Sequence, residues 1–238
     1  MHFLDLTLPA AAENLALDEA LLLAAEAGDS GEVLRVWEWP NPAVVLGSGC
    51  RIAEDVNESA CVADAVPMVR RSSGGGTVLL GQGCLLYTLI LNYQRDPALS
   101  DIRSSYRFIL RCIARALAEG GAVIEQVGVS DLAIAGRKFS GSAQQRKRSF
   151  LLHHGTLLYA FELPLIARYL REPPRQPEYR GGRGHLAFLR NLPLDGQELK
   201  RRLGRAWAAE SLLSALPVAE TRRLAIEKYM SPGWTRRR

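Results

Sequence analysis

The chain has 238 residues, of which 47% are hydrophobic and 23% charged, a composition typical of a globular protein with room for one large domain or two small ones. No uncharged apolar run approaches the roughly 18 residues that span a bilayer, and residues 1–5 lack the basic start and apolar core of a signal peptide. We therefore predict a cytoplasmic protein without a membrane partner. The net charge of +5 suits an acidic protein or a nucleotide, and the low aromatic content of 7% disfavours nucleic acid.

Periodic patterns predict helices and strands in an irregular order. Apolar residues recur on one face at helical spacing over 14–27, 102–119, 194–209 and 220–230. Short apolar or alternating runs predict strands over 33–39, 43–46, 66–70, 77–80, 84–92, 122–126, 132–135 and 150–159. Because no regular βαβ alternation is present, we predict an α+β protein with a mixed β-sheet flanked by helices, forming a single domain over 1–238.

Two features of this pattern stand out. The strand over 84–92 is almost continuously apolar, so it is expected to be buried on both faces. The segment over 171–184 contains three prolines and three glycines. Such a long irregular segment either folds over a site or stays mobile.

A glycine-rich loop with two preceding arginines is the first candidate site. Arg70 and Arg71 precede two serines and three consecutive glycines, and the whole run comprises Arg70, Arg71, Ser72, Ser73, Gly74, Gly75, Gly76, Thr77 and Val78. Glycines allow another molecule to approach the main chain, and N–H groups and guanidinium groups attract anionic oxygens. The spacing excludes both common nucleotide-binding loops. The sequence thus predicts a phosphate or carboxylate site, with a glycine-rich hairpin beside incidental arginines as the alternative.

A second constellation surrounds Lys138. Small residues follow it, namely Ser140, Gly141, Ser142 and Ala143. A lysine here can reach a phosphate or a polarised carbonyl as a point charge, while small neighbours leave room for an elongated ligand. The alternative is a strand-edge lysine whose charged end simply extends into solvent.

The two adjacent histidines, His153 and His154, are expected to point to opposite faces of one strand, and one of them is expected to be a core residue. They are therefore a poor pair of ligands for one metal ion. The four cysteines are spread along the chain without a C-x-x-C pair, which indicates reduced thiols. We predict no metal site.

At this point the motifs resemble the lipoate–protein ligase and octanoyltransferase family, which shares its catalytic domain with biotin–protein ligases. Near the C-terminal end, Lys228 and Tyr229 followed by Trp234 resemble the point where that catalytic domain closes. The resemblance implies a fold of the class II aminoacyl-tRNA synthetase/biotin synthetase type. The matching segments cover 14–20, 70–78, 136–143 and 154–158.

The resemblance also implies a reaction. ATP, accompanied by Mg²⁺, activates lipoate to lipoyl-AMP, and the lysine of an acceptor domain then takes the lipoyl group. Lys138 and Asp131 match the catalytic positions, with Asp131 near the entry of the acceptor amine. Val78, Leu85 and Leu157 are candidates for the wall of the lipoyl tunnel. Binding of the lipoyl-AMP intermediate is expected from Arg70, Arg71, Ser73, Gly74, Gly75, Gly76, Thr77, Val78, Lys138, Ser140, Gly141, Ser142, Ala143, His154, Gly155 and Thr156.

The expected partners are the lipoyl acceptor domains of 2-oxoacid dehydrogenases or the H protein of glycine cleavage. We expect a catalytic domain without the small accessory domain of larger ligases, so a separate accessory subunit is a further expected partner. Leu79 and Leu80 stand where the family usually carries a histidine, which predicts a drier site.

Two other readings of the family resemblance stay open. In an acyltransferase that works through a thioester on a cysteine, Cys84 is the candidate, although a buried strand residue is the simpler interpretation. A relative that binds a lipoyl group without catalysis is the third reading, supported only by the Leu79 and Leu80 departure.

Overall fold

The computed structural model describes residues 1–118, 121, 123–213 and 215–237. Within them, a main sheet has the strand order β11-β1-β2-β6-β10-β9-β8-β7. β1 runs parallel to β2 and β11, whereas the other neighbours are antiparallel. The predicted mixed sheet is therefore confirmed. Its strands are β1 (His2–Asp5), β2 (Val33–Glu38), β6 (Cys84–Asn92), β7 (Glu125–Val127), β8 (Asp131–Ile134), β9 (Arg137–Arg146), β10 (Phe150–Leu158) and β11 (Ser211–Leu212).

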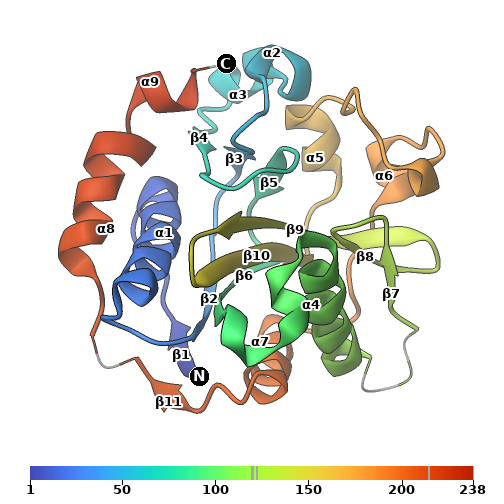
Figure 1. Ribbon diagram of the computed structural model, residues 1–238. Helices are drawn as coiled ribbons and strands as arrows, with labels where there is room; N and C mark the ends of the chain where they lie inside the picture. Colours follow the sequence, from blue (N-terminus) through green and yellow to red (C-terminus); the bar gives the residue numbers. More distant parts are fainter. Residues whose placement is uncertain (119–120, 122, 214, 238) are drawn as a thin grey trace.

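A second, small sheet and the helices surround the main sheet (Figure 1). The small sheet has the order β4-β3-β5, with β4 (Met68–Arg70), β3 (Ala43–Leu46) and β5 (Val78–Leu80). The helices are α1 (Ala11–Ala27), α2 (Ile52–Asp55), α3 (Glu58–Ala63), α4 (Ile102–Leu117), α5 (Pro164–Tyr169), α6 (His185–Phe188), α7 (Gly196–Ala206), α8 (Val218–Leu224) and α9 (Pro232–Thr235).

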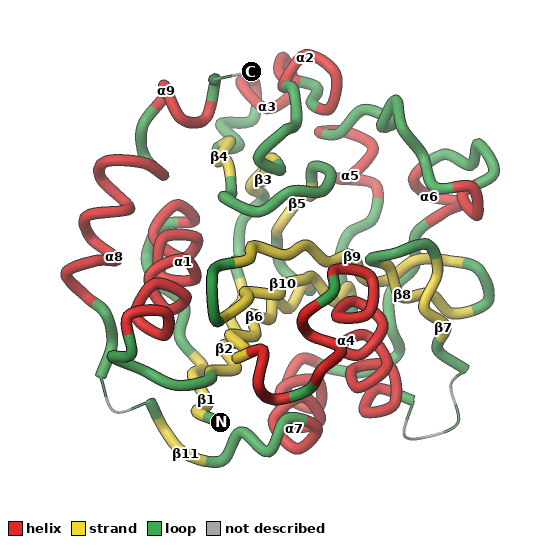
Figure 2. The backbone as a smooth tube through the Cα atoms, viewed as in Figure 1, coloured by secondary structure: helices red, strands yellow, loops and turns green. Residues whose placement is uncertain are grey.

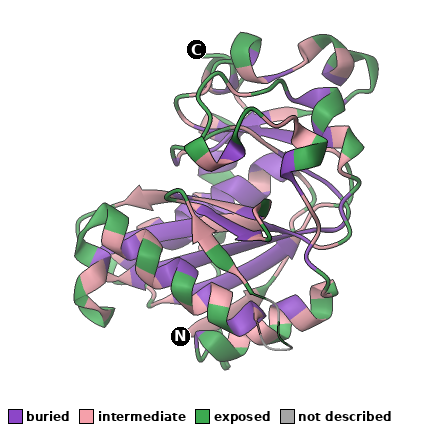
Figure 3. Ribbon diagram, turned by 90° about the vertical axis from the view of Figure 1, so that its right-hand side faces the viewer, coloured by how far each residue is buried: buried purple, intermediate pink, exposed green. Residues whose placement is uncertain are grey.

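The two faces of the main sheet carry different cores. In β6, Leu85 and Leu89 pack with Leu110 of α4 and Leu203 of α7. Ile90 points the other way and packs with the inner face of α1. β6 is buried along nearly its whole length, as its apolar sequence predicted, because α4 and α7 cover one face and α1 the other. In Figure 3 the central strands are buried while the outer faces of the helices are exposed.

Most predicted elements are present, with different ends. The predicted helix over 220–230 is divided into α8 and a π-helical turn, Ala225–Tyr229. In place of the predicted helix over 102–119, α4 ends at Leu117. Residues 119 and 122, at the ends of two predicted elements, lie outside the described residues. The sequence patterns did not predict β1 or the short helices α2 and α3, which are too short to show a clear period.

A buried ion pair joins α1 to the main sheet. Arg35 of β2 is fully buried and donates from Nη1 to Oδ1 of Asp18 at 2.5 Å. Its Nη2 donates to Oδ1 of Asn14 at 2.6 Å, and Thr88 of β6 donates to Oδ2 of Asp18 at 2.8 Å. Burial alone raises the pKa of Asp18, but the charge of Arg35, together with the His154 side chain, more than offsets it and holds that pKa below its usual 3.8.

The next residue of α1 anchors the C-terminal helices. Glu19 accepts hydrogen bonds from Lys228 Nζ at 2.7 Å and from Tyr229 Oη at 2.7 Å. Trp234 donates its indole N–H to the carbonyl of Arg70 at 2.8 Å. The Lys228, Tyr229 and Trp234 cluster therefore closes the fold by bonding to both α1 and β4, and in Figure 1 α8 lies beside α1.

Within the described residues no helix is both long and apolar enough to cross a membrane.

We predict that Asp18→Asn lowers the free energy of unfolding by about 3–5 kcal/mol, because it leaves the guanidinium of Arg35 buried without its countercharge. Urea denaturation followed by circular dichroism measures this. Asp5→Asn is the matched control, since Asp5 is 43% exposed in its ion pair with Lys200 and surface pairs are worth about 1 kcal/mol or less. Equal shifts in the two variants would contradict the prediction.

The same ion pair predicts a pH dependence. The folded-state pKa of Asp18 lies below 3.8, so its contribution is present in full above the ordinary carboxylate range. The contribution is lost as the pH falls through the folded pKa, because the unfolded chain then binds the proton more readily. The wild type should therefore lose stability more steeply than Asp18→Asn as the pH falls below the ordinary carboxylate range, and urea denaturation at a series of pH values should show the gap between the two free energies of unfolding narrow. A gap that stays constant would contradict the prediction.

Candidate active site

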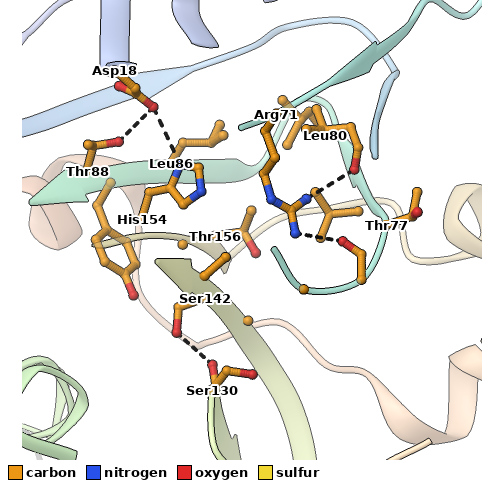
Figure 4. A pocket seen from close by; sticks show the side chains of 18 of the residues that line it. Asp18, Arg71, Thr77, Leu80, Leu86, Thr88, Ser130, Ser142, His154 and Thr156 are labelled. Carbon is orange, nitrogen blue, oxygen red and sulfur yellow. Dashed lines mark hydrogen bonds and ion pairs between the residues drawn. The ribbon is translucent and has the colours of Figure 1, made fainter. Parts of the chain in front are cut away.

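One cavity lies between the main sheet, the small sheet and α1. It holds about 700 Å³ including its open mouth, a size typical of a small-molecule site. Most of its interior is apolar, and its mouth is formed by the exposed glycine loop, the start of β8 and the start of β9 (Figure 4). The apolar wall is formed by Leu15, Trp37, Val45, Val78, Leu80 and Leu86.

The structure brings most of the predicted site residues to this cavity. Elements far apart in the sequence contribute them: the glycine loop between β4 and β5, the turn before β8, and the strands β9 and β10 (Figure 2). The predicted residues that line it are Arg71, Gly75, Gly76, Thr77, Val78, Asp131, Lys138, Gly141, Ser142, Ala143, His154, Gly155 and Thr156.

Arg71 holds the glycine loop from inside. Its Nη2 donates to the carbonyls of Gly74 at 2.6 Å and Gly76 at 2.7 Å, and its Nε donates to Oγ of Ser73 at 3.0 Å. Gly75 has a φ of 80°, which favours glycine. Among the described residues Arg71 forms no ion pair, and burial lowers its pKa to about 10. A buried cation without a countercharge at the wall of a cavity favours an anionic ligand.

Arg70, by contrast, lies outside the cavity, which corrects its predicted role in binding phosphate. Its Nη1 donates to the carbonyls of Gly47 and Cys50 at 2.8 and 2.7 Å, and its Nη2 donates to the carbonyl of Thr235 at 2.8 Å. The side chain is fully buried. Because neighbouring residues of an extended chain point to opposite sides, only one arginine of the pair can face the ligand.

Alternation corrects two other predictions, and the irregular pairing of β8 with β9 between Lys138 and Ser140 corrects a third. Leu85 and Leu157 belong to the core under α4 and α7, so they do not line the tunnel. Their neighbours Leu86 and Thr156 line it instead. Ser140 is buried on the side of β9 that faces away from the cavity. Ser73 and Gly74 also lie outside the lining, although both contact Arg71.

Lys138 and Asp131 face each other at the mouth. Nζ of Lys138 lies 2.9 Å from Oδ1 of Asp131, and the lysine side chain is 27% exposed. The lysine lies over Gly141, where an added Cβ would stand 2.8 Å from Nζ. Gly141 therefore provides the space that lets the ammonium group reach the cavity. Ser142, the next residue of β9, donates its hydroxyl to the carbonyl of Ser130 at 2.8 Å. This bond connects β9 to the turn before Asp131.

The two histidines point to opposite faces, as predicted. His154 lines the cavity, where its Nε2 lies 2.6 Å from Oγ of Ser73 and its Nδ1 lies 3.7 Å from Oδ2 of Asp18 (Figure 4). Burial lowers the pKa of His154, and Asp18 partly offsets this effect. His153 is the core histidine: it is fully buried against Tyr106, and burial lowers its pKa to about 3.

A second cavity adjoins the first at its mouth. It holds about 1310 Å³ including open solvent and shares Thr77, Asp131 and Lys138 with the first cavity. Part of its wall is the segment over 171–184, which is irregular apart from a single turn, Glu178–Arg180. Of the two alternatives that the sequence left open for this segment, the structure shows it as part of a cavity wall, to which it contributes three cations: Arg171, Arg175 and Arg180.

No cysteine lines either cavity among the described residues. Cys84 is fully buried in the core, and burial raises its pKa to about 12. Cys50 lies against the outside of the glycine loop, where its thiol donates to the carbonyl of Gly75 at 3.3 Å, and burial raises its pKa as well. Neither thiol is an activated nucleophile. The described residues also contain no cluster of three His, Cys, Asp or Glu side chains that could hold a metal ion.

Sequence reasoning missed several residues that line the cavity. Asp18 and Thr88 form its polar floor, and Tyr87 lies over Gly155. Asp18 lies within the segment 14–20 that resembles the family, but its spacing from other polar residues did not mark it as a site residue. A charged residue in the middle of an otherwise apolar helix face was the available signal, since such a residue requires a buried partner.

Comparison with known proteins shows the family. Residues 10–213 match the model of the lipoyl protein ligase A/B catalytic domain. The chain is 31% identical over 186 residues to the octanoyltransferase LipM of Carboxydothermus hydrogenoformans, covering 71% of this chain and 69% of that protein. It is 32% identical over 157 residues to a protein of Mycoplasma pneumoniae named probable lipoate-protein ligase A, covering 66% of this chain but only 45% of that protein. The chain therefore belongs to the lipoyl protein ligase A/B family, which includes both ligases and octanoyltransferases.

Solved structures agree on the fold. A chain of the bi-partite lipoate protein ligase of Thermoplasma acidophilum superposes with a TM-score of 0.84 at 21% identity, covering 99% of this chain and 95% of that one. A lipoate-protein ligase A bound with ATP gives a TM-score of 0.81 at 21% identity, with 99% of both chains covered. The fold is that of lipoate–protein ligases, as predicted.

The different burial of the thiols predicts the order in which the cysteines react. In the folded protein, iodoacetamide should modify the half-buried Cys50 and Cys112 first and leave Cys84 unmodified, because Cys84 is inaccessible and remains a thiol. Peptide mass spectrometry after timed alkylation measures the order. Urea-unfolded protein is the control and should react at every cysteine. Alkylation of folded Cys84 as fast as Cys112 would show that the thiol is available for a thioester.

Proposed function

We propose that this protein is a lipoate–protein ligase, which activates lipoate with ATP to lipoyl-AMP and transfers the lipoyl group to a lysine of an acceptor domain. The observation that carries the proposal is the convergence of the Lys138 ammonium group, the Arg71 guanidinium group and the glycine loop on one apolar cavity that no thiol lines. An acyl chain with an anionic head matches such a cavity in shape and charge.

The acyl chain occupies the apolar interior. Trp37, Leu80 and Leu86 form its buried wall, so the chain gains free energy from leaving water, about 0.8 kcal/mol for each buried methylene. Leu80 belongs to the pair that replaces the usual family histidine, and it makes this end of the cavity fully apolar. The carboxylate then lies at the mouth, between Arg71 and Lys138.

In the first step a carboxylate oxygen of lipoate attacks the α-phosphorus of ATP, and the bond to pyrophosphate breaks. Both reactants are anionic, so the barrier falls when fixed cations offset their charge. Lys138 contacts the carboxylate and the α-phosphate, while the backbone of Gly75 and Gly76 lies against the adenylate. Arg71 is fixed by the loop carbonyls and needs no reorganisation as charge develops.

In the second step the amine of the acceptor lysine attacks the acyl carbonyl, an amide bond forms, and AMP leaves with the electron pair of the broken C–O bond. Lys138 stabilises the negative charge on the carbonyl oxygen during the attack. Asp131 lies at the mouth beside Lys138, where its carboxylate orients the incoming ammonium group and helps it to lose its proton.

ATP fits the second cavity, whose wall carries Arg171, Arg175 and Arg180 and which opens onto Lys138. Because no acidic cluster exists among the described residues, Mg²⁺ would enter on the phosphates and be held by them and by water. ATP as co-substrate suits the predicted cytoplasmic location. The expected acceptors are lipoyl domains of 2-oxoacid dehydrogenases or the glycine cleavage H protein, with a separate accessory subunit as a second partner; the similar Thermoplasma ligase is described as bi-partite and was studied with its E2 lipoyl domain.

An octanoyltransferase is the second candidate, favoured by the many relatives named LipM. That reading needs a thiolate near the acyl carbonyl. Residues 121–238 contain no cysteine, and the remaining thiols lie outside the cavity. These observations support the ligase over a transferase that works through a thioester. A binding protein without catalysis is the third reading.

The test offers two donors to the same acceptor. Lipoate with ATP and Mg²⁺, or octanoyl acyl carrier protein without ATP, is incubated with the protein and a lipoyl domain, and intact mass spectrometry follows the acceptor. Acylation only in the first mixture, with pyrophosphate release, supports the ligase. Acylation only in the second supports the transferase, and tight lipoate binding without either supports the binding protein. If neither donor works, the assay is repeated with a candidate accessory subunit.

We predict that Lys138→Ala lowers the rate of lipoyl-AMP formation by about 100-fold or more, because no other ammonium group lines the cavity among the described residues. Lys147→Ala, a distant lysine of the same charge, is the control and should leave the rate unchanged. Single-turnover release of pyrophosphate measures the step. A rate within a factor of two of the wild type would remove Lys138 from the mechanism.

Gly141→Ala tests the position of the lysine rather than its presence. The new Cβ would stand 2.8 Å from Nζ of Lys138, so the flexible lysine tip moves away from the cavity. We expect the rate to fall by about tenfold while the unfolding midpoint in urea changes little, because the contact is with a mobile side-chain end. A large loss of stability with normal activity would contradict this interpretation.

A further inference from the structure

Tyr179 of the segment over 171–184 forms a hydrogen bond at the mouth of the cavity. Its hydroxyl donates to Oδ2 of Asp131 at 2.6 Å. The other carboxylate oxygen, Oδ1, lies 2.9 Å from Nζ of Lys138 and accepts from Ser130 Oγ at 3.2 Å. Both oxygens of Asp131 therefore have partners, and its side chain is only 10% exposed.

The ring of Tyr179 is held independently of its hydroxyl. It packs against Phe188 of α6 with a centroid distance of 5.1 Å, and it lies beside Gly128. Arg183 fastens the backbone nearby: its Nη2 donates to the carbonyls of Tyr179 at 2.7 Å and Gly136 at 3.0 Å. The hydroxyl is thus placed on Asp131 by a packed segment and does not reach it by chance.

We propose that Tyr179 is a positioning residue that caps Asp131, and that the acceptor lysine must displace its hydroxyl before the transfer step. The inference rests on the proposed function. While the Tyr179 hydroxyl is bonded to Asp131, Tyr179 and Lys138 together occupy both oxygens of the Asp131 carboxylate. The segment over 171–184 then covers the approach to the acyl-adenylate. When an acceptor ammonium group takes Oδ2, the segment loses its only hydroxyl bond to Asp131 among the described residues, so it opens as the acceptor arrives.

The cap has a kinetic consequence. The ammonium group competes with a short hydrogen bond to a carboxylate, and such bonds are among the stronger ones. Removing the hydroxyl should therefore help the acceptor to bind. It should also leave lipoyl-AMP less well protected from water when no acceptor is present.

The first experiment compares Tyr179→Phe with Tyr169→Phe. The control is matched, because Tyr169 also donates its hydroxyl to an aspartate, Asp64, at 2.9 Å, but away from both cavities. For Tyr179→Phe we expect the KM for the acceptor domain to fall about fivefold, the hydrolysis of lipoyl-AMP without acceptor to rise, and the KM for lipoate to stay unchanged. An acceptor KM that rises or stays at the wild-type value would overturn the cap.

The second experiment needs no activity, so it separates failure of the cap from failure of the proposed function. Trypsin cleavage after Arg180 and Arg183 reports opening of the segment, because the first side chain is buried and the second is held by backbone carbonyls. We expect Tyr179→Phe to raise the cleavage rate about fivefold and Tyr169→Phe to leave it unchanged.

A double-mutant cycle then assigns the effect to one contact. Asp131→Asn should also accelerate cleavage, and the double variant Tyr179→Phe with Asp131→Asn should be no faster than the more sensitive single variant. Multiplicative acceleration would show that the two residues act separately and would overturn the cap. If the wild type makes no lipoyl-AMP, the proposed function fails while this cycle still decides whether the cap exists.

Discussion

The structure depends on the two-residue alternation of the central strands β6 and β10. These strands pair in antiparallel register, with His154 opposite Thr88 and Gly155 opposite Tyr87. One set of side chains packs under α4 and α7 as core, and the other set faces α1 and the cavity. A shift of the register by one residue would move the apolar core set into the cavity and the polar set into the core. The chemistry of the site is therefore set by the same pairing that stabilises the sheet.

The floor of the cavity shows how charge is tolerated at this depth. Asp18 is almost fully buried, yet Arg35, Thr88 and His154 all lie against its carboxylate. Arg35 is fully buried too, and most of its hydrogen bonds go to α1. A pair of this kind adds little net stability compared with apolar residues, but loss of one partner is costly. It holds α1 at a fixed height above the sheet, and that height sets the depth of the cavity.

The sequence predicted the sheet type and most elements, because glycine runs, small residues and short apolar strands have local causes. Together with the family resemblance, which implied residues such as Asp131 and His154, it predicted thirteen of the residues that line the cavity. The sequence could not show which of two adjacent residues faces the cavity. Arg70 and Arg71, or Leu85 and Leu86, differ only in which side of a strand they take, and that side is set by pairing with distant strands. The contact of the Tyr179 hydroxyl with Asp131 could not be predicted either, since 48 residues separate the two in the sequence. The sequence contains only a weak indication that α1 has buried polar partners, namely a charged residue on an apolar helix face.

The two cations at the mouth differ in their environment, and this difference has a consequence for binding. Lys138 is paired with Asp131 and partly exposed, so its charge is already compensated. Arg71 is buried, donates to carbonyls and a hydroxyl, and keeps its charge at neutral pH with a pKa of about 10. Its desolvated charge is relieved when an anion binds, whereas Lys138 must share its partner. Under the proposed function, Arg71 therefore favours capture of the anionic ligand, whereas Lys138 divides its charge between Asp131 and the reacting groups.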